Sequence, residues 1–255
     1  MVMTVQEPKI TPLIILRSLA FALFFFTWAP FGSLAALIVS KLSKDRAVFL
    51  KWIALWVGVI DWGERVILNL HHEKIGLEHL PPAPFIAALQ HQSAWEAMQV
   101  PIWFPNAAIV LKQELLDVPL WGPCMDLYGA IPVQRAKKGS DIRRMLTTGE
   151  QFVAQKRAIV IFPQGTRVKL GETKPYQRGV GVLYEHLNIP VVPIALNSGE
   201  YWGRKKLFGF LSIHKPGCIR VTIHSPIPAG LPRDEMMAKL QSAIEGTNLY
   251  SARAR

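Results

Sequence analysis

Short apolar runs alternate with stretches of helical periodicity along the chain after residue 62. Several of these runs are apolar without interruption, which is typical of strands that are buried on both faces of a sheet. The alternation predicts an α/β fold with a mainly parallel mixed sheet flanked by helices. The expected strands are residues 66–70, 85–89, 108–111, 129–133, 158–162, 191–196 and 218–223, and the expected helices are residues 93–103, 140–155, 179–187 and 232–245.

The N-terminus has a different pattern, in which residues 18–40 form an uncharged stretch of 23 residues. At about 1.5 Å per residue, this stretch is long enough to cross a hydrocarbon core of about 30 Å. Pro30 and Gly32 interrupt it, so it forms either one kinked span or a re-entrant pair of helices over 12–29 and 31–40. A cleaved signal peptide is the competing interpretation, but the apolar stretch continues past the small residues at 32–36.

Charges around this stretch predict its orientation. Four basic residues follow it closely and two precede it, so the positive-inside bias places the bulk of the chain on the cytoplasmic face of the inner membrane. The next apolar segment, residues 47–60, fits either an interfacial helix or a core helix. We therefore expect membrane-anchoring helices in residues 1–62 and an α/β domain in residues 63–255.

The composition fits one sizeable globular domain with a short appendage. The 255 residues are 50% hydrophobic, and the two cysteines, Cys124 and Cys218, lie far apart. These values exclude a disordered chain, a disulfide scaffold and a thiolate zinc site. The adjacent His71 and His72 do not suggest a metal site either, because neighbouring strand residues face opposite ways and no third ligand is suitably spaced.

Positive charge is concentrated in one window of the chain. Residues 135–220 contain 16 Lys or Arg and 5 Asp or Glu, a net charge of +11, whereas the other residues contain 13 of each kind. Such a window is either a solvated basic surface or a binding surface for nucleic acid, anionic lipid or phosphorylated metabolites. Because the window contains no RNP-type aromatic block and no zinc-finger spacing, we do not expect nucleic acid as a partner.

A histidine and a carboxylate follow the strand expected at 85–89, in the segment QHQSAWE (90–96). On one continuous helix, His91 and Glu96 would lie about 140° apart and could not meet. They can meet if His91 lies in the turn before the helix and Glu96 in its first turn, where the carboxylate would orient the imidazole as a general base. Ser93 and Glu96 also fit a capping box, so the alternative is that Glu96 only caps the helix.

A second polar segment, FPQGTR (162–167), follows the strand expected at 158–162. Its Pro and Gly favour a turn, and Gly165 lets a ligand approach the backbone. Arg167 provides a planar pair of donors suited to phosphate, and Arg178 begins a helix whose N-terminal amides also favour an anion. The alternative is that Arg167 is only a solvated side chain at a strand exit.

Four segments together resemble a known family. HQSAWE (91–96), GAIPVQR (129–135), FPQGTR (162–167) and VVPIALNSG (191–199) are similar in order and spacing to the four motifs of the glycerolipid acyltransferases, in particular the bacterial 1-acyl-sn-glycerol-3-phosphate acyltransferases. The resemblance covers roughly residues 71–202. It differs at two positions, since Glu96 stands where the family has Asp, and Gln164 where it usually has Glu.

The resemblance implies a reaction and a set of site residues. His91, steadied by Glu96, would take the proton of the sn-2 hydroxyl of lysophosphatidic acid as that hydroxyl attacks an acyl thioester, giving phosphatidic acid without a covalent acyl-enzyme. The thioester of coenzyme A or acyl carrier protein would be a co-substrate, and no cofactor is implied. Backbone N–H groups near Gly165 or after Ser93 would bear the oxyanion. The expected substrate-binding residues are Gln164, Gly165, Thr166, Arg167, Arg135 and Arg178.

Two other functions are compatible with these segments. An acyltransferase of the same kind could use glycerol 3-phosphate or a different lysolipid as its acceptor. A non-catalytic lipid-binding protein on the same fold is the other alternative, and the neutral Gln164 permits it.

Overall fold

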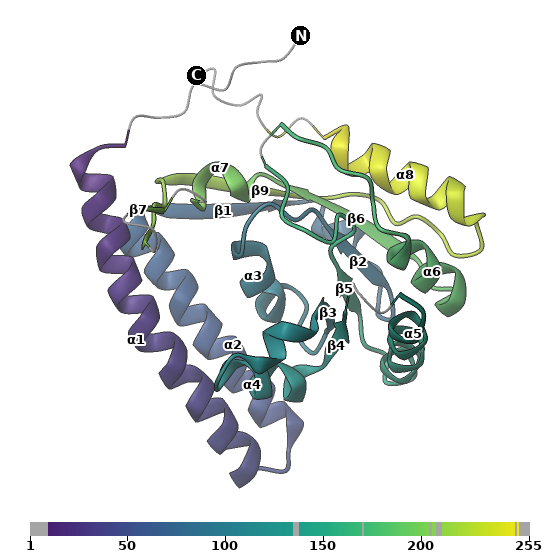
Figure 1. Ribbon diagram of the computed structural model, residues 1–255, viewed down its shortest axis with the longest axis horizontal. Coiled ribbons are helices and arrows are strands. Elements are labelled where there is room, and N and C mark those ends of the chain that lie inside the picture. Colours follow the sequence, from purple (N-terminus) through teal and green to yellow (C-terminus); the bar gives the residue numbers. More distant parts are fainter. Residues whose placement is uncertain are drawn as a thin grey trace.

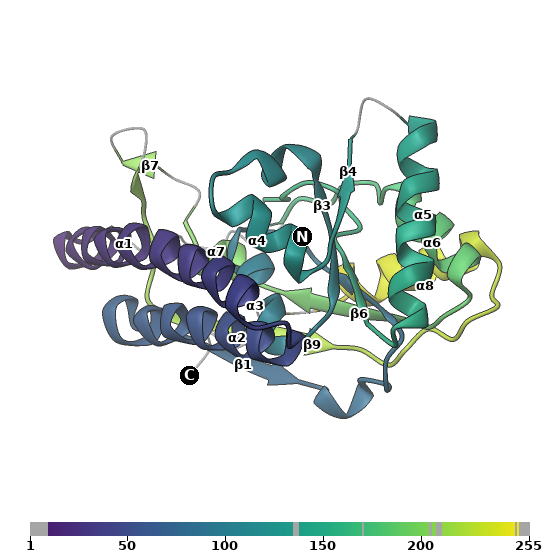
Figure 2. The same cartoon turned by 90° about the horizontal axis from the view of Figure 1, so that it is seen from below.

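The computed structural model describes residues 10–134, 138–169, 171–203, 206–207, 211–247 and 249. Its centre is a seven-stranded sheet between two layers of helices (Figures 1 and 2). Five strands run parallel, β9 is antiparallel to its neighbour β6, and β1 is parallel to β9. In sheet order the strands are β1 (Leu70–Ile75), β9 (Gly217–Ile223), β6 (Val191–Leu196), β2 (Ile86–Leu89), β5 (Ile159–Ile161), β3 (Ala108–Lys112) and β4 (Ala130–Val133).

The predicted α/β class and mainly parallel sheet are confirmed, but the strand expected at 66–70 is wrong. Glu64–Leu68 forms a π-helical turn, η1, that continues α2 (Arg46–Gly63), and Asn69 turns the chain with a left-handed φ of 53°. The strand begins at Leu70, and buried and more exposed residues alternate along it because β1 lies at the edge of the sheet. Residues 66–68 are thus the apolar end of a helix.

The four expected helices of the domain are present, and several short elements were missed. The short elements carry too few residues to show a helical or alternating period, which is the signal that sequence patterns provide. The expected helices are α3 (Trp95–Trp103), α5 (Lys138–Ala154), α6 (Arg178–Leu187) and α8 (Arg233–Glu245). The missed elements are η2 (Leu77–His79), η3 (Gln113–Asp117), α4 (Trp121–Tyr128), α7 (Ser198–Tyr201), β7 (Lys206–Leu207) and β8 (Leu211–Ser212).

The helices divide into two layers because strand side chains alternate between the faces of the sheet. Along β2, Ala87 and Leu89 join a core formed with α1 to α4, whereas Ile86 and Ala88 join a second core formed with α5, α6 and α8. Both sets of β2 side chains are fully buried. The carboxyl end of β2 therefore lies between two packed layers, where the following turn is held on both sides.

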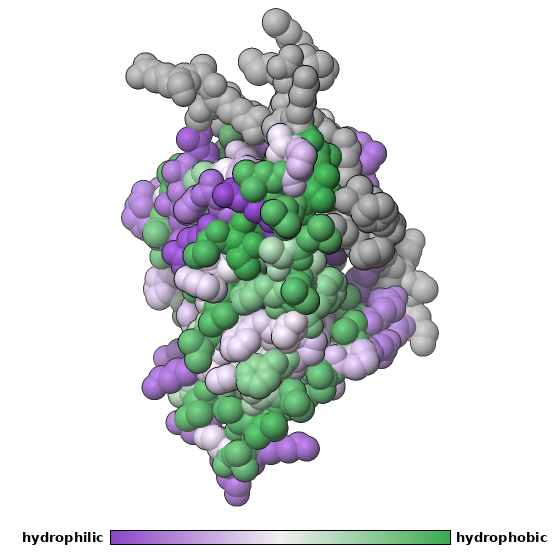
Figure 3. Space-filling model, turned by 90° about the vertical axis from the view of Figure 1, so that its left-hand side faces the viewer, coloured by the Kyte–Doolittle hydropathy of each residue, from purple (hydrophilic) through white to green (hydrophobic). Residues whose placement is uncertain are grey.

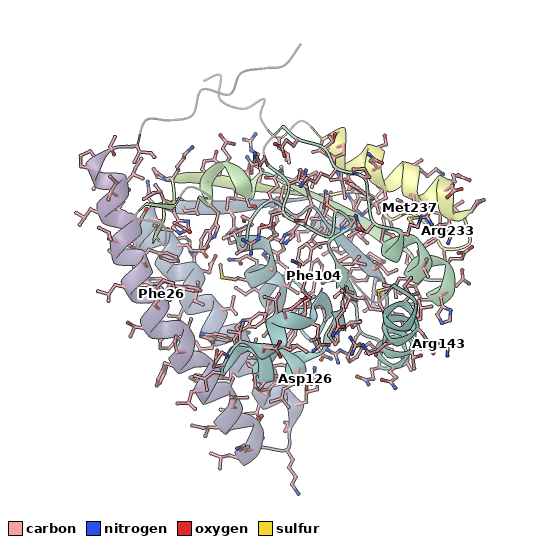
Figure 4. All side chains as sticks on the ribbon, in the orientation of Figure 1. Phe26, Phe104, Asp126, Arg143, Arg233 and Met237 are labelled. Atoms are coloured by element: carbon pink, nitrogen blue, oxygen red, sulfur yellow. The ribbon has the colours of Figure 1, made fainter. Side chains whose placement is uncertain are left out.

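The N-terminal apolar stretch forms one continuous helix, α1 (Pro12–Leu42), with Pro30 inside it. This resolves the choice between one span and a re-entrant pair. The helix is long and apolar enough to cross a membrane, and only 17% of its most apolar window is buried, unlike the core helix of a soluble protein. Figure 3 faces this side of the molecule and shows its apolar surface, and Phe26, labelled in Figure 4, is 72% exposed. The exposed apolar side chains on α1 include Leu13, Leu16, Leu19, Leu23, Phe31, Leu34, Ile38 and Leu42.

Helix α2 packs against both α1 and α3. The indole N–H of Trp52 donates to the carbonyl of Gly32 on α1 over 3.0 Å, and a Cβ at Gly32 would clash with Trp56. Ile53 and Ile60 are buried in the core that α1 to α4 share with the sheet. The other side of α2 carries the exposed apolar side chains of Val48, Leu55 and Trp62, so the helix is compatible with both interpretations of residues 47–60.

Candidate active site

His91 and Glu96 meet at the carboxyl end of β2. His91 lies in the turn after the strand, and Glu96 lies in the first turn of α3. The Nδ1 atom of His91 is 2.9 Å from Oε1 of Glu96. Since Nδ1 faces the carboxylate, it carries a proton in the neutral ring, and Nε2 is the nitrogen left to accept one. The imidazole is partly exposed and lies against the ring of Phe162, with 4.3 Å between ring centroids.

The Glu96 carboxylate is fully buried and bonded at both oxygens. Oε1 also accepts the backbone N–H groups of Gln92 at 2.7 Å and Ser93 at 2.8 Å, and Oε2 accepts the hydroxyls of Ser93 and Ser198 at 2.7 Å each. Burial alone would raise the pKa of Glu96, but hydrogen bonds from His91 and the two serines, with the charge of His91, outweigh it and lower that pKa. The carboxyl is therefore ionised, and it holds both the backbone of the turn before α3 and the imidazole of His91.

Gln164 supports the His91 turn from behind. Its side chain is 2% exposed, and its Oε1 accepts the backbone N–H of His91 over 3.2 Å. The His91 carbonyl in turn accepts the N–H of Val168 over 2.8 Å. Among the described residues, Gln164 Nε2 has no hydrogen-bond partner. The side-chain oxygen of Gln164 therefore holds the His91 backbone, and its Nε2 is a donor without a partner among the described residues.

The loop after β5 places several of the predicted residues beside His91. Gly165 has a left-handed φ of 62°, and it lines one cavity with Thr166, Arg167, Arg178 and His91. The Gly165 N–H donates to the Phe162 carbonyl over 2.8 Å. This N–H is thus already used within the turn, and the expectation that backbone N–H groups near Gly165 or after Ser93 bear the oxyanion stays a prediction. The predicted site residue at position 135 lies outside the described residues.

The cavity has a volume of about 1410 Å³ and two chemical regions. Its wall includes His91 and the basic side chains of Lys112, Arg167 and Arg178. The rest of the wall is mostly apolar and includes residues of the N-terminal helices α1 and α2. This arrangement can hold an anionic headgroup beside the imidazole and a hydrocarbon chain further inside. The apolar wall includes Phe25, Ile53, Trp56, Ile60, Met98 and Met125.

A second buried carboxyl lies on the other side of α3. Glu64 is 1% exposed, and its Oε2 accepts the indole N–H of Trp95 over 2.7 Å. Burial, opposed only in part by the Trp95 hydrogen bond, raises the pKa of Glu64 to about 8. Its Oε1 and the Oε1 of Gln99 are both buried without a partner among the described residues. A proton on Glu64 would supply the donor that such a pair of oxygens lacks.

Glu64 should make the stability of the protein depend on pH. The folded pKa of about 8 lies above the ordinary value of 4.5, so between these values the folded state holds a proton that the unfolded state lacks. The free energy of unfolding should therefore fall as the pH rises through this window, by up to about 1.4 kcal/mol per pH unit. Glu64→Gln should remove most of this slope in denaturant unfolding from pH 5 to 9, and equal slopes for both proteins would contradict the assignment.

Most of the site residues came from the sequence motifs, but the hydroxyl of Ser198 and the ring of Phe162 were missed as parts of the site. Ser198 reaches Glu96 across a sequence separation of 102 residues. The signals that could have found it were its place in the VVPIALNSG motif and just after β6, the strand that pairs with β2 through Leu89 and Ile194.

Comparison with known proteins supports the interpretation of these motifs. Residues 71–197 match the family model described as Acyltransferase. The chain is 29% identical over 220 residues to a 1-acyl-sn-glycerol-3-phosphate acyltransferase of Pseudomonas aeruginosa, covering 86% of this chain and 82% of that protein. It is 27% identical over 218 residues to the human 1-acyl-sn-glycerol-3-phosphate acyltransferase alpha, covering 84% of this chain and 74% of that one.

The fold also has a counterpart among solved structures. The crystal structure of PlsC, the 1-acyl-sn-glycerophosphate (LPA) acyltransferase of Thermotoga maritima, matches with a TM-score of 0.72 at 19% identity. The match covers 91% of this chain and 93% of that one. The matched segment 71–197 contains His91, Glu96 and the loop after β5, so the residues that meet at the cavity lie inside it. The chain therefore belongs to the acyltransferase family.

Proposed function

We propose that this chain is a 1-acyl-sn-glycerol-3-phosphate acyltransferase, which moves a fatty acyl group from a thioester to the sn-2 hydroxyl of lysophosphatidic acid and so forms phosphatidic acid. The observation that carries the proposal is the 2.9 Å contact between His91 and Glu96 on the wall of a cavity with one basic region and one apolar region. The activity for which the bacterial and human relatives are named supports the choice of acceptor.

The proposed chemistry is direct transfer. Nε2 of His91 takes the proton of the acceptor hydroxyl as its oxygen bonds to the thioester carbonyl carbon, and Glu96 stabilises the imidazolium that forms. The carbon–sulfur bond then breaks, and the leaving thiolate takes a proton from His91. A covalent acyl-enzyme is not needed, because neither Cys124 nor Cys218 lies on the cavity wall. The donor is the acyl thioester of coenzyme A or of acyl carrier protein.

The basic region of the cavity is proposed to hold the acceptor's phosphate. Arg167 and Arg178 lie on the wall that His91 shares, and Gly165 and Thr166 complete that part of the wall. A guanidinium can contact two phosphate oxygens at once. Gln164, which supports the His91 backbone, is proposed to act mainly through that support. Arg135 belongs to the same proposal on the basis of its motif alone.

The proposal includes a location. Residues 1–62 anchor the α/β domain of residues 63–255 to membrane lipid, with the exposed apolar side of α1 in contact with the acyl chains. The basic residues that follow α1 closely support placement on the cytoplasmic face of the inner membrane. The apolar region of the cavity reaches Phe25 and Trp56 of the N-terminal helices, so a lipid chain in the cavity would lie near that anchor.

A panel of acceptors tests the proposed reaction. The purified full chain would be supplied with a labelled acyl-CoA or acyl carrier protein thioester and with lysophosphatidic acid, glycerol 3-phosphate or lysolipids that carry other headgroups. Thin-layer separation should show label mainly in phosphatidic acid. Faster transfer to glycerol 3-phosphate or to another lysolipid would assign a different acceptor, and no transfer to any member with either donor would contradict the proposal.

Arg167→Ala should mainly weaken binding of the acceptor. Loss of charge-assisted hydrogen bonds to phosphate should raise the acceptor KM by about 10- to 100-fold, with little change in the donor KM. Arg167→Lys should recover only part of the loss, because a point charge replaces a fork of donors. Arg233→Ala, which removes an exposed arginine of α8 paired with Glu185 outside the cavity, is the matched control. A rise in the donor KM alone would assign Arg167 to the thioester instead.

A further inference from the structure

Ser198 connects a distant part of the chain to the His91–Glu96 pair. It is fully buried at the start of α7, directly after β6. Its Oγ lies 2.7 Å from Oε2 of Glu96 and 2.8 Å from the Oγ of Ser93. The other hydrogen-bond partners of the Glu96 carboxylate among the described residues all come from residues 91–93, on the same turn as the histidine. Among the described residues, Ser198 is thus the one outside contact with this carboxylate.

The segment that carries Ser198 is fixed in place on both sides. Asn197 accepts the backbone N–H of Arg220 on β9 over 2.7 Å, which ties the segment to the sheet. Gly199 donates its N–H to Oε1 of Gln92 over 3.0 Å, which ties it to the His91 turn. A hydroxyl between two such attachments has little freedom to leave Glu96. It can therefore hold the Glu96 carboxylate in one orientation.

The two carboxylate oxygens of Glu96 contact different groups. Oε1 faces Nδ1 of His91 and two backbone N–H groups, and Oε2 faces only the two hydroxyls. A rotation of the carboxylate that broke the Ser198 contact would also move Oε1 away from the imidazole. Because the geometry of a catalytic group must be held within a fraction of an ångström, such a contact bears on the rate.

We propose that Ser198 is a positioning residue for acyl transfer, which holds Oε2 of Glu96 so that Oε1 stays on His91. The proposal rests on the proposed function, because it assigns Ser198 a role in the reaction of that same site. It adds a residue from the VVPIALNSG segment that acts on His91 only through Glu96 and does not lie on the cavity wall.

A double-mutant cycle with Glu96→Gln separates this role from a general role in folding. Ser198→Ala should lower kcat by about 10- to 100-fold, as expected for a lost hydrogen bond to a charged group. The KM values of acceptor and donor should change by less than about threefold, because no binding contact is removed. In the Glu96→Gln background the same change should cost less than about threefold, because the charge that Ser198 holds is already gone.

Tyr184→Phe is the matched control for loss of one buried hydroxyl. Tyr184 lies on α6 and does not line the cavity. Its hydroxyl donates to the carbonyl of Pro228 over 2.6 Å. This variant should leave kcat unchanged relative to each background, wild type and Glu96→Gln, and thermal unfolding of all variants measures any loss of fold. An equal loss of kcat from Ser198→Ala in both backgrounds, or a wild-type kcat, would overturn the role of Ser198. A fast Glu96→Gln single variant would instead overturn the dyad of the proposed function.

Discussion

Replacing His91 with alanine is expected to lower acyl transfer by about 10²- to 10⁴-fold, the range usual for a lost general base. The imidazole is the one titratable side chain that both touches Glu96 and lines the cavity among the described residues. The carboxylate, the basic wall and the apolar wall would remain, so the KM values should change much less than kcat. Steady-state kinetics with lysophosphatidic acid and both thioester donors measures each quantity.

His186→Ala gives a matched control for this substitution. His186 on α6 also pairs with a carboxylate, because its Nε2 lies 2.6 Å from Oε1 of Glu150, but both side chains are exposed and outside the cavity. The control should keep full turnover, and both variants should sediment with membranes as the wild type does. A His91→Ala protein that retained more than about a third of wild-type turnover would show that the imidazole is not the base.

The central strands could be predicted because they are buried on both faces and carry nearly continuous apolar runs. The edge strand β1 could not, because one side of it is in contact with solvent and its sequence, LHHEKI, is mostly polar. The apolar residues just before it were assigned to the strand instead. Short elements such as α4 and α7 depend on packing against the sheet, and no local period in the sequence indicates them.

The candidate site could likewise be predicted only in part from the sequence. His91 and Glu96 are five positions apart, so the local geometry of one strand-to-helix turn was enough to predict their contact. The hydroxyl of Ser198 depends on the pairing of β2 with β6, which a single sequence does not provide. The role of Gln164 as a support for the His91 backbone is likewise a contact between two loops at the carboxyl ends of neighbouring strands.

Glu96→Gln is expected to give a well-folded protein with a kcat lowered by about 10²- to 10³-fold, within the range for groups that assist proton transfer. The amide is nearly the same size and its oxygen can still accept the N–H groups of Gln92 and Ser93, so the turn before α3 keeps these hydrogen bonds. It loses the charge that stabilises the imidazolium and fixes the tautomer of His91. Kinetics and thermal unfolding, measured on the same preparations, separate the two effects.

Glu96→Asp and Glu150→Gln complete this test. Aspartate keeps the charge on a side chain one methylene shorter, so this variant should retain activity within about tenfold of the wild type, far above the Gln variant. Glu150→Gln removes the carboxylate of the exposed pair on α5 and α6 and should change nothing. If the Gln variant at position 96 were as active as the wild type, Glu96 would serve only to cap α3. If Glu96→Gln failed to fold while Glu96→Asp folded and was active, the negative charge at position 96 would be required for the structure of the turn.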